Sequence, residues 1–191
     1  MRYSIRVFAL GLVAIAPLAA AQTDSALEDG ARKLAAQLQS ALASRLLAEV
    51  KAGGPAAAIN VCNTVAPSLA AEISRREGVR LTRVSLKTRN ALLGTPDAWE
   101  QAVLKRFDER VAKGEKPEAL EHAEIVTEPN GRYFRYMKAL PVQALCVNCH
   151  GAPDALAPEV KAQLAKDYPF DQATGYREGQ VRGAISLKRP L

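Results

Sequence analysis

Residues 144–151 read ALCVNCHG and bring two of the chain's three cysteines and one of its two histidines within five positions. Cys146, Cys149 and His150 form the pattern C-x-x-C-H, whose spacing is typical of covalent haem attachment. Two thiols three positions apart can each bond one vinyl group at a haem edge, and the next residue can turn its imidazole under the iron. We therefore expect one haem c, with the two cysteines as tethers and the histidine as an axial ligand.

A cluster of two cysteines and a histidine could also serve two other kinds of chemistry. A C-x-x-C pair can be a thioredoxin-like redox dithiol, but the flanking residues do not have the pattern of a βαβ unit. A zinc site with four protein ligands needs more cysteine and histidine than a chain with three Cys and two His readily supplies. The C-x-x-C-H spacing therefore favours haem over a redox dithiol and over zinc.

A second axial ligand would have to come from outside the motif, where the candidates are Cys62, His122 and Met137. His122 lies in the charged segment EALEHAEIV, which is typical of an exposed surface. Met137 lies on an expected strand and could line a haem pocket, although methionine more often fills a gap in a core. Cys62 lies on the apolar face of an expected helix, where a buried free cysteine would act as a small apolar residue. These residues by themselves leave the second ligand open.

The first 21 residues have the pattern of a cleavable secretory signal peptide. A short basic start precedes an apolar run at residues 7–20, and Ala19–Ala21 supplies an A-x-A cleavage site. The run is short for a membrane span and contains Pro17, which disfavours a retained anchor. We expect export to the periplasm, no stable membrane insertion after cleavage, and residues 22–191 as one domain.

Charge and cysteine count exclude some partners. The formal net charge is +6, but the 26 basic residues are interleaved with 20 acidic ones and form no stripe or patch of the kind that binds nucleic acid. Exported proteins usually pair their cysteines, and three is an odd number. At least one thiol is therefore free or has another use.

Two helices are expected before the first strand. The first has a capping box at Ser25 and ends at Gly53–Gly54, and its apolar stripe fits either a core or the face of a homodimer. The second begins at Pro55 and carries Cys62 on its apolar face. Because Pro67 cannot donate a backbone hydrogen bond, a kink or break is expected just after Cys62.

The remaining elements alternate between strands and helices. They are a strand at 79–90, a helix at 95–114 capped by Thr95, a hairpin at 123–142 turning at 129–131, a helix at 157–168 and a last strand at 179–191. This order predicts an α+β fold with an antiparallel sheet.

Four separated blocks carry a resemblance to a known family. They are INVCNTVAPSLA at 59–70, VSLKTRNALLGTPDAWE at 84–100, YFRYMKALPVQALCVNCHG at 133–151 and YPFDQATGYREGQVRGAISLKRPL at 168–191. In this order they resemble the Tll0287-like (DUF3365) family of c-type haem proteins with a PAS-like domain. The resemblance implies a PAS-like antiparallel sheet with N-terminal helices and a haem held against the sheet.

The resemblance also implies the two axial ligands, which fall here on His150 and Cys62. One departure is visible, because the family often shows RNP.N where this chain has Arg89-Asn90-Ala91-Leu92. No role for that loop is therefore carried over from the family.

Two functional classes are compatible with a His/Cys site. A thiolate ligand stabilises ferric iron and lowers the reduction potential, so we expect an exported one-electron carrier with an unidentified redox partner protein. The alternative is a haem-based redox or gas sensor that signals through a separate partner. An enzyme such as a peroxidase would need acid–base groups at an open distal site. Only His122 is at hand for this role, so we expect no enzymatic activity.

Overall fold

A computed structural model describes the backbone of residues 16–191 and the side chains from residue 24 onward. Most of the predicted signal peptide, at residues 1–21, lies outside the described residues. Within residues 16–191, none of the helices combines the length and the apolar character that a membrane span requires.

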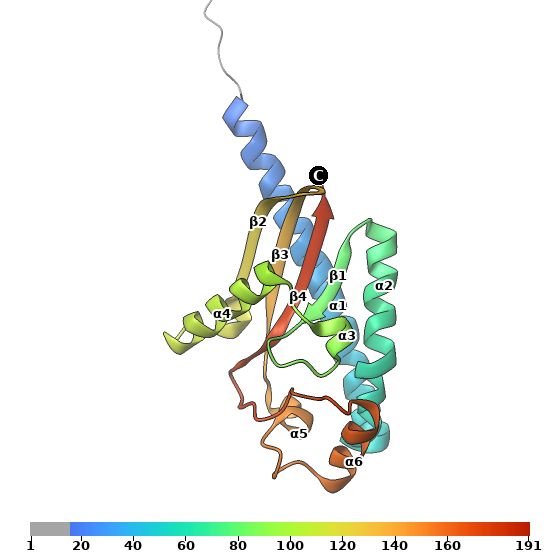
Figure 1. Ribbon diagram of the computed structural model, residues 1–191. Coiled ribbons are helices and arrows are strands. Elements are labelled where there is room, and N and C mark those ends of the chain that lie inside the picture. The colour runs from blue at the N-terminus through green and yellow to red at the C-terminus, as the bar shows by residue number, and fades with distance from the viewer. Residues whose placement is uncertain (1–15) are drawn as a thin grey trace, which may run out of the picture.

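Four strands form one antiparallel sheet in the order β1-β4-β3-β2. The strands are β1 (Arg80–Val84), β2 (Glu121–Glu128), β3 (Gly131–Pro141) and β4 (Val181–Pro190). As predicted, β2 and β3 form a hairpin that turns between Glu128 and Gly131. The last strand inserts between β3 and β1 (Figure 1). The predicted α+β fold with an antiparallel sheet is confirmed.

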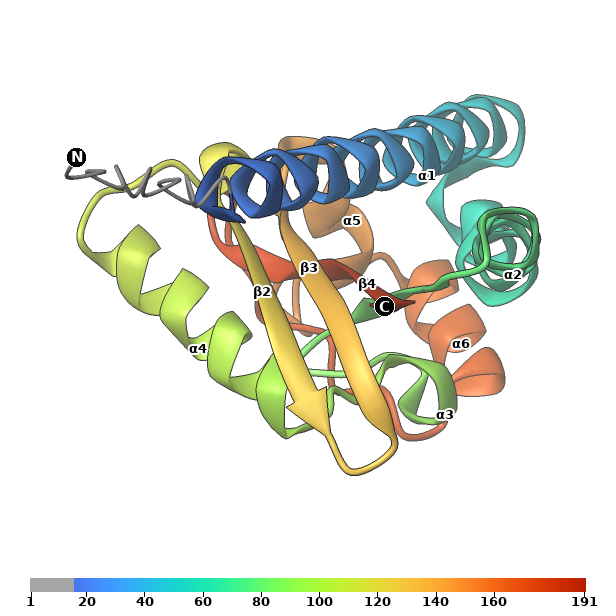
Figure 2. The ribbon, with the colours of Figure 1, turned by 90° about the horizontal axis from the view of Figure 1, so that it is seen from above.

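Helices surround this sheet on both faces. They are α1 (Ala16–Asn60), the π-helical turn η1 (Val61–Val65), α2 (Ala66–Glu77), α3 (Ala91–Gly94), α4 (Ala98–Ala112), the 3-10 turns η2 (Pro117–Ala119) and η3 (Ala144–Cys146), α5 (Val147–His150) and α6 (Pro158–Asp167). Figure 2 shows α1 and α4 on opposite sides of the β2–β3 hairpin.

Each face of the sheet has its own apolar core. Because side chains alternate along a strand, Tyr136 of β3 packs with Leu38 of α1, whereas the next residue, Met137, packs with Phe107 of α4. In the same way Ile185 of β4 belongs to the α1 core. This alternation decides which side chains of β3 can reach a site on the α1 side of the sheet.

The first helix differs from its prediction at its start and agrees at its end. It begins at Ala16 rather than at a cap on Ser25, because residues 16–22 are rich in alanine, the best helix former. Gly54 interrupts it with φ 78° and ψ 179°, a conformation that glycine adopts freely. Pro55 then starts the next helical segment, as predicted.

The sequence predicted Thr95 as the N-cap of α4, but the cap is Asp97. The carboxylate of Asp97 accepts from the backbone N–H of Glu100 at 2.8 Å, and the Glu100 carboxylate accepts from the Asp97 N–H at 2.8 Å. This reciprocal pair is a capping box, which a cap at Thr95 could not form with Glu100. The Thr95 hydroxyl instead donates to the Ala91 carbonyl at 2.6 Å.

The capping box also begins a buried ionic cluster under α4. Glu100 is fully buried and lies 3.4 Å from the guanidinium of Arg135, and it accepts a hydrogen bond of 2.6 Å from the Ser186 hydroxyl. Arg135 is 3% exposed and also pairs with Asp97 at 2.6 Å. The cluster therefore ties α4 to β3 and β4.

We expect Glu100→Ala to lower the free energy of unfolding by about 3 kcal/mol, at the low end for a broken buried pair because Asp97 still neutralises Arg135. Urea unfolding measures this loss. Glu109→Ala, at an exposed position of the same helix, is the matched control and should change stability by less than about 0.5 kcal/mol. Equal stabilities of the two variants would contradict a structural role for the buried carboxylate.

Candidate functional site

The C-x-x-C-H motif begins at Cys146, five positions after β3 ends at Pro141. Cys146 is the last residue of η3, and Cys149 and His150 lie on the single helical turn of α5. The chain leaves α5 at Gly151, where an added Cβ would lie 2.5 Å from the Val147 carbonyl oxygen. The chain can therefore bend away sharply after His150 only because residue 151 is glycine.

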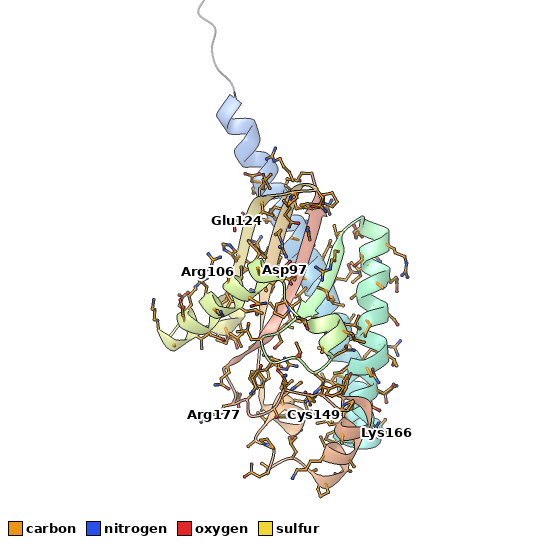
Figure 3. All side chains as sticks on the ribbon, viewed as in Figure 1. Asp97, Arg106, Glu124, Cys149, Lys166 and Arg177 are labelled. Atoms are coloured by element: carbon orange, nitrogen blue, oxygen red, sulfur yellow. The ribbon has the colours of Figure 1, made fainter. Side chains whose placement is uncertain are left out.

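The two motif thiols are available for chemistry. Cys146 and Cys149 are free and partly buried. Cys149 packs against the apolar cluster around α6, and its thiol donates to the Pro55 carbonyl, 3.9 Å away at the kink of α1. Burial raises the pKa of Cys149. Figure 3 places Cys149 at the end of the molecule that holds α5 and α6, away from Asp97 and α4.

The ring of His150 is held in one orientation. Its Nδ1 lies 2.7 Å from the carbonyl oxygen of Ala173, which can only accept, so this contact places the proton on Nδ1. Nε2 then keeps its lone pair, and the Arg182 guanidinium, whose Nε lies 3.1 Å from Nδ1 and 3.4 Å from Nε2, donates to Nε2. Burial, followed by the charges of Arg182 and Arg89, holds the pKa of His150 well below its usual 6.5. The imidazole is therefore neutral at pH 7, the state in which Nε2 can ligate a metal.

A cavity of about 380 Å³ opens beside His150. Cys62 lines the same cavity from η1, although it lies 88 positions earlier in the sequence. The remaining walls come from α2, β1, the loop at 85–90, α3 and the start of β4, with Leu140 of β3 and Tyr168 after α6. The structure thus brings together the two residues that the resemblance named as axial ligands.

The turn that carries Cys62 is π-helical. The backbone N–H of Ala66 bonds to the carbonyl of Val61, five positions back. A widened turn absorbs the hydrogen bond that Pro67 cannot donate, which explains why the helix continues instead of breaking. The sequence predicted a kink or break just after Cys62; the structure has a π-turn at this place, and the helix continues through it.

The walls of the cavity combine apolar and positively charged side chains. Its apolar walls include Leu81, Leu92, Leu93 and Leu140, and its cationic side chains are Arg80, Arg83, Arg89 and Arg182. No aspartate or glutamate lines it within residues 16–191. Burial lowers the pKa of Arg182, whose guanidinium donates to the Ser85 hydroxyl at 2.8 Å. Such walls suit a flat apolar ligand with negatively charged groups.

Tyr168 closes the α6 side of this cavity. It is 6% exposed and packs with Ile59 and Leu164. Burial raises the pKa of its phenol to about 12, so the hydroxyl remains a hydrogen-bond donor at neutral pH.

Two other candidates from the sequence lie elsewhere. Met137 does not line the cavity, which corrects the prediction that it could, because the alternation of β3 directs it into the core under α4. His122 is the register partner of Met137 and packs against Trp99, with ring centroids 5.7 Å apart. Its side chain is 28% exposed, so it is half-buried, whereas the sequence predicted an exposed surface position.

Three residues near His150 were missed in the sequence. Arg89, Asp171 and Arg182 all lie within one or two contacts of its ring. No local pattern marks them, because Arg89 and Asp171 are 82 positions apart. The only signal in the sequence was that Arg89 and Asp171 both fall in blocks that carry the family resemblance.

Comparisons with known proteins point to one family. A model of the Tll0287-like family matches residues 20–190. A crystal structure of the cyanobacterial heme-protein Tll0287 has 29% sequence identity and a TM-score of 0.53, over 68% of this chain and 71% of that one. No curated protein matches the chain.

Proposed function

This chain belongs to the Tll0287-like family, and from this membership we propose that it binds one haem c covalently and carries single electrons in the periplasm. The observation that supports the proposal is that a thiol and an imidazole, Cys62 and His150, line one cavity next to the free thiols of the C-x-x-C-H motif. The similar cyanobacterial structure is described as a haem protein.

The residues fit a haem. Cys146 and Cys149 offer two thiols on one turn of chain, and His150 offers an unprotonated Nε2. The leucines of the cavity suit a porphyrin plane. Arg83 and Arg182, which have no salt-bridge partner among the described residues, suit the two propionates. The volume lies within the range of roughly 300–1,000 Å³ for small-molecule sites.

The iron of a bound haem would supply the one-electron chemistry by changing between its ferric and ferrous states. Cys62 would ligate as a thiolate, a strong anionic donor that favours the ferric state and lowers the reduction potential. A neighbouring metal cation would keep this thiol deprotonated. The arginines of the cavity act in the opposite direction, because positive charge favours the state with one more electron.

We propose export by the signal peptide at residues 1–21 and electron exchange with a separate redox protein. A non-enzymatic role is supported by the position of His122. This histidine, the only one outside the motif, packs against Trp99 on the α4 side of the sheet, whereas the cavity is at the end near α3 and α6. It therefore cannot serve as an acid–base group at the candidate site.

A redox or gas sensor is the second candidate, and the π-turn at Cys62 favours it. Such turns occur frequently at functional sites. If Cys62 takes up a proton from solvent and leaves the cavity on reduction, η1 would move with it and could shift α2, which follows it in the chain. A partner protein could then detect the displacement of α2.

Carbon monoxide separates the two candidates. For a carrier whose ligands both stay in place, we expect the dithionite-reduced wild type to show no carbon monoxide spectrum in stopped-flow mixing. Cys62→Ala, in which one axial position is open, is the control and should bind the gas rapidly. Rapid binding by the wild type, together with a change in helical circular dichroism, would favour the sensor.

A further inference from the structure

A buried ion pair lies directly behind the C-x-x-C-H motif. Arg89, from the loop before α3, pairs with Asp171, from the loop after α6, at 3.0 Å. Their side chains are only 7% and 10% exposed. An isolated pair at this depth has little reason to persist for stability alone, because burying two charges costs about as much as their attraction returns.

The pair is connected to the last two residues of the motif, Cys149 and His150. Arg89 donates through Nη2 to the carbonyl of Cys149 and, at 3.3 Å, to that of Ala173. Asp171 accepts from the backbone N–H of Ala173 at 2.8 Å. The same Ala173 carbonyl accepts from Nδ1 of His150. These contacts link Arg89, Asp171 and Ala173 to the Cys149 peptide and the His150 imidazole, and so hold that peptide and ring together.

Arg89 also brings its charge close to the ring nitrogen that would ligate iron. Its Nη1 lies 3.5 Å from Nε2 of His150. Because the pair is shielded from solvent, salt and water screen this charge much less than they would at the surface. The carboxylate of Asp171 is the nearest counter-charge to Arg89. It therefore determines how strongly the positive charge of Arg89 acts on His150.

We propose that Arg89 and Asp171 are a positioning pair that orients His150 and sets the reduction potential of the haem bound by it. The inference rests on the proposed function and goes beyond it, because it assigns the tuning of the site to two residues that are not ligands.

The two halves of the pair should act in opposite directions. Without the charge of Asp171, the uncompensated Arg89 favours the ferrous state and the reduction potential rises. Without the charge of Arg89, Asp171 is left as a buried negative charge that favours the ferric state, and the potential falls. A merely structural pair would give two shifts of the same sign, or none.

The test is a redox titration of the haem-loaded protein, in wild type and in Asp171→Asn and Arg89→Gln. We expect shifts of opposite sign, each about tenfold in the reduction equilibrium, which is about 59 mV for one electron. Exposed residues provide matched controls, Asp154→Asn and Arg177→Gln, for which the equilibrium should change much less. Arg177 is labelled in Figure 3 at the edge of the molecule.

Arg89→Lys keeps the positive charge but loses the hydrogen bonds made by the planar guanidinium. The reduction potential of this variant should therefore lie near that of the wild type. Thermal melting of each variant shows whether it is folded. Shifts of equal sign, no shifts, or a potential of Arg89→Lys equal to that of Arg89→Gln would overturn the proposal. A wild type that carries no haem would instead refute the proposed function, so the two failures are distinguishable.

Discussion

Replacing Cys62 with alanine is expected to abolish the thiolate signature of the ferric protein and to raise its reduction potential by more than about 100 mV. Axial ligands tune haem potentials over about 0.8 V, and losing an anionic sulfur removes the strongest stabilisation of ferric iron at this site. Absorption and electron paramagnetic resonance spectra report the ligand, and a redox titration reports the potential. Cys62 is the residue to test because it is the only cysteine of the chain outside the C-x-x-C-H motif.

The matched control for this variant is Thr64→Ala. Thr64 lies two positions further along the same π-turn, is exposed, and its hydroxyl donates to the Asn60 carbonyl at 2.9 Å. Its loss should leave the spectrum unchanged, so a general disturbance of η1 can be told apart from the loss of a ligand. A low-spin thiolate spectrum that persists in Cys62→Ala would rule out Cys62 as the axial ligand.

The double variant Cys146→Ala/Cys149→Ala is expected to lose covalent haem completely. Each motif thiol would form one thioether bond, and with neither present any haem is held by ligation alone. After expression with the signal peptide in a bacterium that attaches haem c, haem staining of a denaturing gel gives the result. The wild-type band should stain and the band of the double variant should not.

Cys62→Ala is the informative control in this experiment as well. It also lacks a thiol near the cavity, yet its haem should stay attached, because Cys62 is proposed as a ligand and not as a tether. A stained band in the double variant would mean that covalent attachment does not depend on the motif. Loss of stain in Cys62→Ala would mean that the roles of the three cysteines have been assigned wrongly.

Short sequence patterns predicted those features of the candidate site that depend on only a few neighbouring residues. The C-x-x-C-H spacing marked three residues of the candidate site. Gly54 marked the kink before Cys62, and Pro67 marked the irregular turn that contains Cys62. Each of these follows from backbone chemistry within a few residues, which needs no knowledge of the fold.

Features that depend on tertiary contacts could not be predicted in this way. The alternation of β3 requires Met137 and Leu140 to face opposite sides of the sheet, but only the packing of the helices shows which side holds the cavity. The Arg89–Asp171 pair joins two loops with no pattern of their own. The start of α1 was missed for a different reason, since an apparent capping box at Ser25 competes with the helix propensity of the alanines before it.

The position of Cys62 on a helix that precedes the whole sheet has a mechanical consequence. Ligation by both Cys62 and His150 would close a loop of 88 positions through the iron, as a disulfide closes a loop through sulfur. By the chain-entropy relation for such a cross-link, this closure restricts the unfolded chain and stabilises the folded one by about 4–5 kcal/mol. Unlike a disulfide, this link could open and close with the gain and loss of one electron. The stability with which the N-terminal helices pack on the remainder of the molecule would then depend on the oxidation state of the iron.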